Sequence, residues 1–349
     1  MATTVTRYVN TDSSAGGDGT TNNTSGSTRA YATLAAALSS FAGRDLVSNN
    51  EVWIINVSAP SGVQDTTNAT LDCTSDATRY PRIICTQDHG GKWNTGVYRL
   101  ASASPITIVS TCIVSQLIGL QISVTGSGGA NCNPGIYIQS GGAFIDRCIV
   151  RGTEFSGSGT GGIPIGIYAS GDKNVYISNS LIYDFSMIDE YALASGVQCY
   201  YNTNFVMSNC TIINCRRGVR GSGAGSAKIR NCIFQCNSEN GAFIDFAADT
   251  FNSANCKNNL TSDASAVGAS SVTSTTLTFV DKASDDFHLA SSDTAAINAG
   301  ADLSADVPSL MLSVNDADNV ARSGTWDIGA DEYVAPVTGY KNLPLLGVG

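Results

Sequence analysis

Short runs with the same pattern of apolar and polar positions recur through the middle of the chain. In each run apolar and polar residues alternate on both sides of a central pair, the third and fourth residues of the run. The third residue is mostly Gly or Asn, and the fourth is mostly Cys or another residue that is commonly buried. Such alternation, with a period of two, is typical of β-strands. The runs are LIGLQI at 117–122, IDRCIV at 145–150, ISNSLI at 177–182, MSNCTI at 207–212 and IRNCIF at 229–234, with a weaker ANCKN at 254–258.

The fourth position of every run forms one row, and the residue before it forms a second. The row consists of Leu120, Cys148, Ser180, Cys210, Cys232 and Cys256, separated by 28, 32, 30, 22 and 24 positions. The preceding residues are Gly119, Arg147, Asn179, Asn209, Asn231 and Asn255. Glycine and asparagine tolerate a left-handed backbone, so we expect a tight corner at these positions.

A third row supports the same register. Glycine followed by an apolar residue occurs at 135, 166, 196, 218 and 241, and the distance from each glycine forward to the fourth-position row is 13, 14, 14, 14 and 15 residues. The distance between the glycine row and the fourth-position row is nearly constant, although the length of the whole repeat varies. The extra residues of the longer repeats therefore lie in loops outside the repeating element. We therefore predict an all-β solenoid in which parallel coils stack at about 4.8 Å. The alternative is an antiparallel sandwich, whose hairpin spacing is shorter.

The two ends differ from the repeat and are expected to cover its open edges. Residues 29–44, RAYATLAAALSSFAGR, predict a helix with Ser27 or Thr28 as N-cap and Gly43 as the stop. The expected organisation is an N-terminal cap and first coils at 1–104, regular coils at 105–260, last coils and a C-terminal cap at 261–333, and a tail at 334–349.

These ends carry a family resemblance. RYVNTDSSAGGDGT followed by AYATLAAAL is similar to the entry motif of right-handed parallel β-helix proteins of the pectin-lyase-like class. DFHLASSDTAAINAGADLS at 286–304 and NDADNVARSGTWDIGADEY at 315–333 resemble the closing segments of that class. GGKWNTGVYRL at 90–100 is similar to β-helix proteins of tailed bacteriophages and prophages. The resemblance implies a single-stranded right-handed parallel β-helix with a short N-terminal capping helix.

Composition narrows the partners and the location. The formal charge of -10 opposes binding to a nucleic acid backbone. No signal peptide or membrane-spanning run is evident, which predicts a chain made in the cytoplasm. The eleven cysteines form no CxxC pair and stand at no ligand spacing from the two histidines, so we expect buried thiols and no zinc site of that type.

The residues two positions after each glycine of the third row are expected to point outward and to stack on one another in successive coils, as a ladder. Its members are Tyr137, Tyr168, Gln198, Arg220 and Phe243. Aromatic, amide and guanidinium groups can hold sugar rings, and this is the predicted ligand-binding surface. The alternative is that the ladder packs against a loop or a neighbouring subunit.

Carboxylates are sparse on the predicted outer faces. Asp146 stacks on Ser178, so it has no acidic partner for hydrolysis by paired carboxylates. If the protein is an enzyme, the best catalytic set is Asp184, Asp189 and Glu190 together with Arg220, with Arg216 and Arg217 nearby. The alternative is a solvated loop paired with a basic corner. The acids of 315–324 suggest calcium as the one cofactor to consider; otherwise no cofactor and no metal are expected.

The residues directly after the fourth-position row form one further row, which is expected to lie on a surface that something else covers. Gln121, Ile149, Leu181, Thr211 and Ile233 should point outward, where branched apolar side chains need a cover. Either the corner turns them inward or another chain lies against them, and we favour the second. The phage resemblance implies a homotrimer.

Three functions follow. The first is a non-enzymatic structural protein of a phage virion, a head decoration, spike or fibre-like part, which associates with other virion proteins and can also bind host-surface glycans. In this function the tail 334–349 serves as an attachment strand or a trimer contact; the alternative for the tail is a disordered end. The second is a polysaccharide lyase or glycoside hydrolase. The third is a carbohydrate-binding module that uses the Tyr137, Tyr168 and Phe243 ladder without turnover. The fold class alone does not choose among them.

Overall fold

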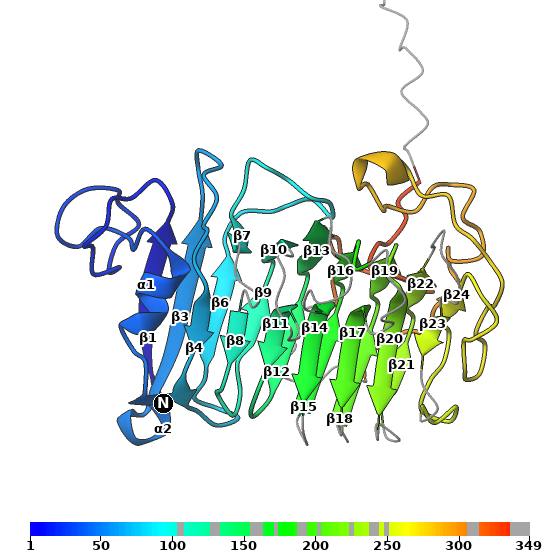
Figure 1. Cartoon of the computed structure of the whole chain (residues 1–349), viewed down its shortest axis with the longest axis horizontal. Coiled ribbons are helices and arrows are strands. Elements are labelled where there is room, and N and C mark those ends of the chain that lie inside the picture. The colour runs from blue at the N-terminus through cyan, green and yellow to red at the C-terminus, as the bar shows by residue number, and fades with distance from the viewer. Residues whose placement is uncertain are drawn as a thin grey trace, which may run out of the picture.

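The chain winds into a stack of coils whose strands form three long parallel sheets (Figure 1). The computed structural model describes residues 1–102, 108–125, 133–153, 163–170, 174–186, 194–200, 204–222, 227–236, 244–247, 251–305 and 314–335. Figure 1 shows the N-terminal coils in blue at one end of the stack and the last coils in yellow at the other. The predicted solenoid is confirmed.

Each regular coil gives one strand to each sheet in turn. Sheet 1 runs in the order β1 (Thr3–Asn10), β3 (Glu51–Ser58), β6 (Pro81–Cys85), β9 (Gln116–Ile118), β12 (Ala143–Asp146), β15 (Asn174–Ser178), β18 (Asn204–Ser208) and β21 (Lys228–Arg230). Sheet 2 contains β7 (Arg99–Ser102), β10 (Gln121–Thr125), β13 (Ile149–Thr153), β16 (Leu181–Tyr183), β19 (Thr211–Ile213), β22 (Ile233–Gln235) and β24 (Leu260–Thr261).

Sheet 3 closes each coil. It contains β4 (Ala69–Leu71), β8 (Ile108–Ser110), β11 (Asn133–Ile138), β14 (Pro164–Ser170), β17 (Ser195–Tyr200), β20 (Arg217–Ser222) and β23 (Ile244–Ala247). A short pair, β2 (Arg44–Asp45) and β5 (Cys73–Thr74), lies apart from the three sheets. All pairings between these strands are parallel, as in β11 with β14 and β14 with β17.

The corner between sheets 1 and 2 has the predicted left-handed backbone. Its φ angles are +65° at Gly119, +50° at Arg147, +48° at Asn179 and +51° at Asn209 and Asn231. The prediction is wrong for the last coil. Ile233 pairs with Leu260, so the corner residue there is Asn258, with φ +51°, instead of Asn255.

The fourth-position row points into the core, as predicted. Leu120, Cys148, Ser180, Cys210 and Cys232 are all fully or almost fully buried. The same register error places Asn259, and not Cys256, beside Cys232, whose backbone N–H donates to Asn259 Oδ1 at 3.1 Å. All ten cysteines among the described residues are free thiols, and nine of them are buried.

The glycine row marks a close approach between coils. A Cβ at Gly166 would lie 2.5 Å from the carbonyl oxygen of Gly196 and 2.7 Å from Ile182 Cγ2, so no larger residue fits. The row ends one coil earlier than predicted. Val219 pairs with Phe246, which leaves Asp245, and not Gly241, beside Gly218.

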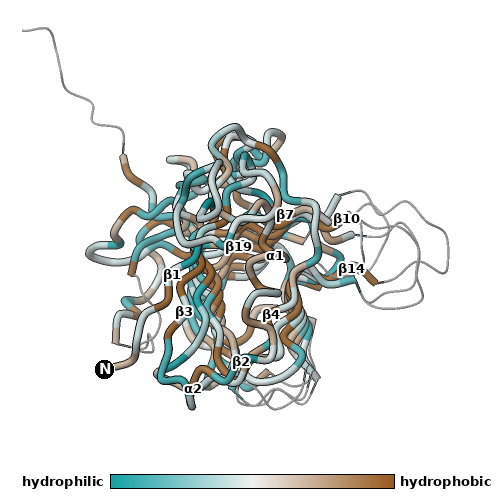
Figure 2. The backbone as a smooth tube through the Cα atoms, turned by 90° about the vertical axis from the view of Figure 1, so that its left-hand side faces the viewer, coloured by the Kyte–Doolittle hydropathy of each residue, from teal (hydrophilic) through white to brown (hydrophobic). Residues whose placement is uncertain are grey.

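A short helix covers the N-terminal end of the core. Helix α1 (Leu34–Ser39) is shorter than the predicted 29–44, and its N-cap is Thr33, whose side chain accepts from the Ala36 N–H, instead of Ser27 or Thr28. Leu34, Leu38 and Phe41 are buried in the coil interior, and α1 lies across it in the end-on view (Figure 2). Helix α2 (Leu46–Asn49) and the 3₁₀ helix η1 (Lys282–Ser284) are shorter still. Among the described residues no helix is long and apolar enough to span a lipid bilayer.

The chain's own C-terminal segment, of which residues 277–305 and 314–335 are described, covers the outer face of sheet 2. It passes above β16, β19 and β22 in Figure 1. Ile149, Leu181 and Ile233 form a second hydrophobic cluster with residues of this segment that include Leu277, Phe279, Phe287 and Ile328. The predicted row does point outward, but the expectation that another chain covers it is wrong.

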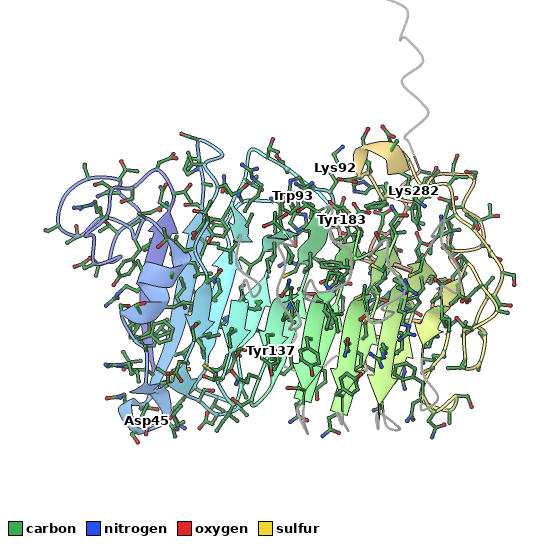
Figure 3. All side chains as sticks on the ribbon, viewed as in Figure 1. Asp45, Lys92, Trp93, Tyr137, Tyr183 and Lys282 are labelled. Atoms are coloured by element: carbon green, nitrogen blue, oxygen red, sulfur yellow. The ribbon has the colours of Figure 1, made fainter. Side chains whose placement is uncertain are left out.

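The loop after β6, residues 86–98, completes the cover. Gln121 is fully buried; its Oε1 accepts from the Asn94 N–H at 2.7 Å, and its Nε2 donates to Tyr98 O at 3.2 Å. Trp93 lies beneath the guanidinium of Arg151, 3.7 Å from the ring centroid. Figure 3 shows Lys92, Trp93 and Tyr183 close to Lys282 of the C-terminal segment. Segments about 190 residues apart therefore meet over sheet 2.

Candidate functional site

The predicted outward ladder on sheet 3 exists. Tyr137 pairs with Tyr168, Tyr168 with Gln198, and Gln198 with Arg220 on successive strands. The rings of Tyr137 and Tyr168 stack with centroids 5.1 Å apart and planes 9° apart. Figure 3 shows Tyr137 on the outer side of β11.

Two members of the ladder differ from the prediction. Gln198 is only 3% exposed, and its Oε1 accepts from Ser195 Oγ at 3.3 Å, so it is not available to a large ligand. Phe243 lies outside the described residues. The register of β23 places Ala247 beside Arg220, so the position assigned to Phe243 belongs to Ala247.

Tyr200 belongs to this surface and was missed by the sequence analysis. Its ring lies edge-on to Tyr168, with centroids 6.2 Å apart at 89°, and the Arg220 guanidinium lies 5.3 Å from its centroid. The signal was available, because Tyr200 stands two positions after Gln198 on the same strand and alternation turns it the same way. We call Tyr137, Tyr168, Tyr200, Arg217 and Arg220 the tyrosine–arginine stripe.

Positive charge is concentrated at one end of the stripe. Partial burial, and then the neighbouring positive charges of Arg220 and Arg216, lower the pKa of Arg217. No ion pair between described residues involves Arg217 or Arg220. Guanidinium groups bind carboxylate and sulfate groups through paired hydrogen bonds, and tyrosine faces stack on sugar rings.

Asp184, the described carboxylate of the predicted catalytic set, lies apart from Arg220 of the same set. It follows β16 on sheet 2, and its Oδ1 accepts from Asn214 Nδ2 at 3.1 Å. Burial raises its pKa, while the positive charges of Arg151 and Lys282 oppose this. Asp189 and Glu190 lie outside the described residues. The Arg216 N–H donates to the carbonyl oxygen of Phe185, the residue after Asp184, and within the described part of the chain no ion pair joins Asp184 to Arg217 or Arg220.

Asp146 has a structural role at the corner. It is 4% exposed, and its Oδ1 accepts from Ser178 Oγ at 2.6 Å and from Asn179 Nδ2 at 2.9 Å. Its other oxygen pairs with Arg147 Nε at 3.2 Å. Its ladder neighbour is Ser178, as predicted, so the sheet offers it no second carboxylate.

A small pocket opens at the same corner. Its volume is about 130 Å³, and its lining includes Cys85, His89, Arg147 and Asn319. Sites for small-molecule ligands usually enclose about 300–1,000 Å³. His89 Nε2 lies 2.9 Å from the Arg147 carbonyl oxygen, and burial lowers the pKa of its imidazole. The pocket is therefore too small for a sugar, and its histidine is held by the backbone.

The other histidine belongs to a cluster of carboxyl groups in the C-terminal segment. His288 lies beside Asp286, Asp318 and Asp331. Burial, and then the nearby Asp318 carboxylate, raise the pKa of Asp316 to about 8. Burial raises the pKa of Asp331 to about 6. The sequence analysis singled out 315–324 but did not connect it with His288 or Asp331.

Residues 118–283 match a family model described as a right handed beta helix region. The fold is a right-handed parallel β-helix. The matched region contains the whole tyrosine–arginine stripe. No curated protein matches the chain.

Proposed function

We propose that this β-helix is a non-enzymatic structural protein of a phage virion, a head decoration, spike or fibre-like part, and that its tyrosine–arginine stripe binds glycans of the host surface. The observation that supports it most is the chemistry of the stripe: aromatic rings and guanidinium groups with no carboxylate among them. A surface of this kind can hold a sugar chain but offers no pair of carboxylates to hydrolyse it.

The spacing of the stripe suits an extended polymer. Coils repeat at about 4.8 Å, so a glycan lying along the helix axis meets Tyr137, Tyr168, Tyr200 and then Arg220 on four successive strands of sheet 3. The ring edges and phenol hydroxyls of the tyrosines lie along such a chain, and the guanidinium groups bind acidic substituents. The protein as a whole is acidic, so the local positive charge favours an anionic glycan at this place only.

Replacing Tyr168 by alanine is expected to weaken binding to an acidic polysaccharide about tenfold, equivalent to about 1.4 kcal/mol, because the central ring of the stripe is lost. Titration calorimetry with soluble polygalacturonate measures this, with neutral dextran as the comparison polymer. The matched control is Tyr176→Ala, since Tyr176 stacks on Phe144 at 4.7 Å on sheet 1, outside the stripe. Equal losses in the two variants would contradict the assignment.

The virion role predicts that the chain is present in purified phage particles at a fixed copy number. Quantitative mass spectrometry of particles from the producing strain measures this, and absence from intact particles would exclude the role. Location in the virion, after assembly in the bacterial cytoplasm, and a homotrimeric state are parts of the same proposal. The trimer rests on the phage resemblance, because the row that suggested an interface is covered by the chain itself.

A polysaccharide lyase or glycoside hydrolase is the second candidate, and the raised pKa of Asp184 is the observation that favours it. A carboxyl group whose pKa is raised by burial is a candidate general acid. Release of reducing ends from a polysaccharide that disappears in the Asp184→Asn variant would support this activity over the structural role.

A further inference from the structure

One histidine and two aspartates from separate turns meet where the loop 86–98 packs against the C-terminal segment. One donor atom from each of His288, Asp318 and Asp331 lies within 4.8 Å of the other two. His288 Nε2 is 3.9 Å from Asp318 Oδ2. These distances place all three donors around one small volume.

The histidine is oriented for ligation. Its Nδ1 lies 2.5 Å from Asp286 Oδ1, and the other oxygen of Asp286 pairs with Lys92 Nζ at 2.9 Å. When Nδ1–H donates to a carboxylate, the lone pair of the neutral ring is on Nε2, and this nitrogen faces Asp318. Metal-binding histidines in proteins are held in this way by a carboxylate behind the ring.

The volume beside Nε2 is left open by the backbone. Gly91 has φ +64°, and a Cβ at this position would lie 2.5 Å from His288 Nε2 and 3.2 Å from Asp318 Cβ. Asp318 Oδ1 is buried and has no hydrogen-bond partner. A lone pair on nitrogen and a carboxylate group thus border the same volume, and among the described residues no donor satisfies Oδ1 of that carboxylate.

The third ligand stands on a rigid turn. Asp331 is 8% exposed, and its Oδ2 accepts from the Leu289 N–H at 2.7 Å. The buried guanidinium of Arg322 donates to Gly329 O at 2.8 Å and to Ala330 O at 3.0 Å, which fixes the backbone that leads into Asp331. A site on backbone held in this way needs little rearrangement to bind an ion.

We propose that His288, Asp318 and Asp331 bind one divalent transition-metal ion, with zinc the best fit, and that Asp286 is a positioning residue. Zinc accepts imidazole nitrogen together with carboxylate oxygen and needs only three protein ligands when water supplies the fourth. Calcium, the ion that the acids of 315–324 suggested, prefers six to eight oxygen ligands. The bound ion joins His288 to Asp318 and Asp331, which lie in separate turns of the C-terminal segment, close to Gly91 of the loop 86–98. It thereby stabilises the cover over sheet 2.

The test is a zinc titration of the full chain after treatment with a chelator, followed by calorimetry. Asp318→Asn is the main variant, because Asp318 is half-buried and its Oδ1 has no hydrogen-bond partner among the described residues. His288→Ala is the second variant. The matched control is Asp302→Asn, an exposed aspartate of the same segment. Cobalt replaces zinc in a parallel titration, because its visible spectrum distinguishes nitrogen and oxygen ligands from the thiolates of the eleven cysteines.

We expect saturable binding of one zinc ion per chain, a higher Tm with zinc, and a cobalt spectrum without thiolate bands. Asp318→Asn should weaken binding about tenfold or more, while Asp302→Asn binds like the unaltered chain. The chain contains two histidines, so a shift of only the His288 imidazole in an NMR spectrum identifies the ligand. Absence of saturable binding, equal affinity in Asp318→Asn, or tighter binding of calcium than of zinc would each overturn the proposal.

Discussion

Replacement of Phe287 by alanine is expected to destabilise the C-terminal segment by about 3–5 kcal/mol, since a fully buried aromatic side chain is removed without a substitute. Phe287 is 2% exposed and lies between Tyr183, 4.9 Å from its ring centroid, and Phe279, 5.8 Å away. Hydrogen exchange followed by mass spectrometry measures the effect, which should appear as faster exchange across residues 277–335 while the regular coils remain protected.

The matched control for this variant is Val280→Ala. Val280 belongs to the same segment but is 59% exposed, so its truncation should change the stability by less than about 0.5 kcal/mol. Loss of the cover should also make the Phe287→Ala protein self-associate, because Ile149, Leu181 and Ile233 become accessible. A Phe287→Ala protein that exchanges like the control and stays monodisperse in light scattering would show that the segment is held by other contacts.

Substitution of Gly141 by alanine is expected to lower the free energy of unfolding by about 2–5 kcal/mol. A left-handed backbone costs a residue with a Cβ about 1–2 kcal/mol, and overpacking adds about 1–3 kcal/mol. Gly141 has φ +70°, and its Cβ would lie 2.0 Å from the carbonyl oxygen of Cys112 on the preceding coil. Chemical denaturation followed by far-UV circular dichroism measures the loss.

Gly43 provides the control for the backbone contribution. Its φ is +71°, almost the same as that of Gly141, but a Cβ there would meet nothing within 4 Å. Gly43→Ala should therefore cost only the conformational part, about 1–2 kcal/mol. If the two variants lose the same stability, the coil-to-coil contact at Gly141 is not as close as the structure has it.

The repeat was predictable because a solenoid places residues of one type at the same position of every coil. Asn179, Asn209 and Asn231 share both a left-handed backbone and a place in the register, and this combination is visible in the sequence. The same reasoning failed in the last coil. ANCKN matches the pattern in letters, but Asn258 and not Asn255 turns the corner, because a local motif carries no information on which of two asparagines three positions apart does so.

The cover over sheet 2 and the histidine cluster could not be predicted from periodicity. The C-terminal segment has little regular secondary structure, so its buried residues, such as Leu277 and Phe287, follow no repeating interval. The ion pair of Lys92 with Asp286 joins residues 194 positions apart. A single sequence specifies such a contact only through the complete fold, whereas the outward direction of Ile149 and Leu181 follows from alternation alone.

That long-range contact also determines when, during synthesis of the chain, the cover over sheet 2 can form. Coils that pair with their neighbours can wind while the ribosome is still translating the rest of the message. Lys92 and Trp93, in contrast, emerge early and must wait for residues 277–335, the last part of the described chain to be made. During that interval the outer apolar residues of sheet 2, such as Ile149 and Leu181, are exposed on the nascent chain. A polysome holds several such chains close together, and we expect misassembly to begin there.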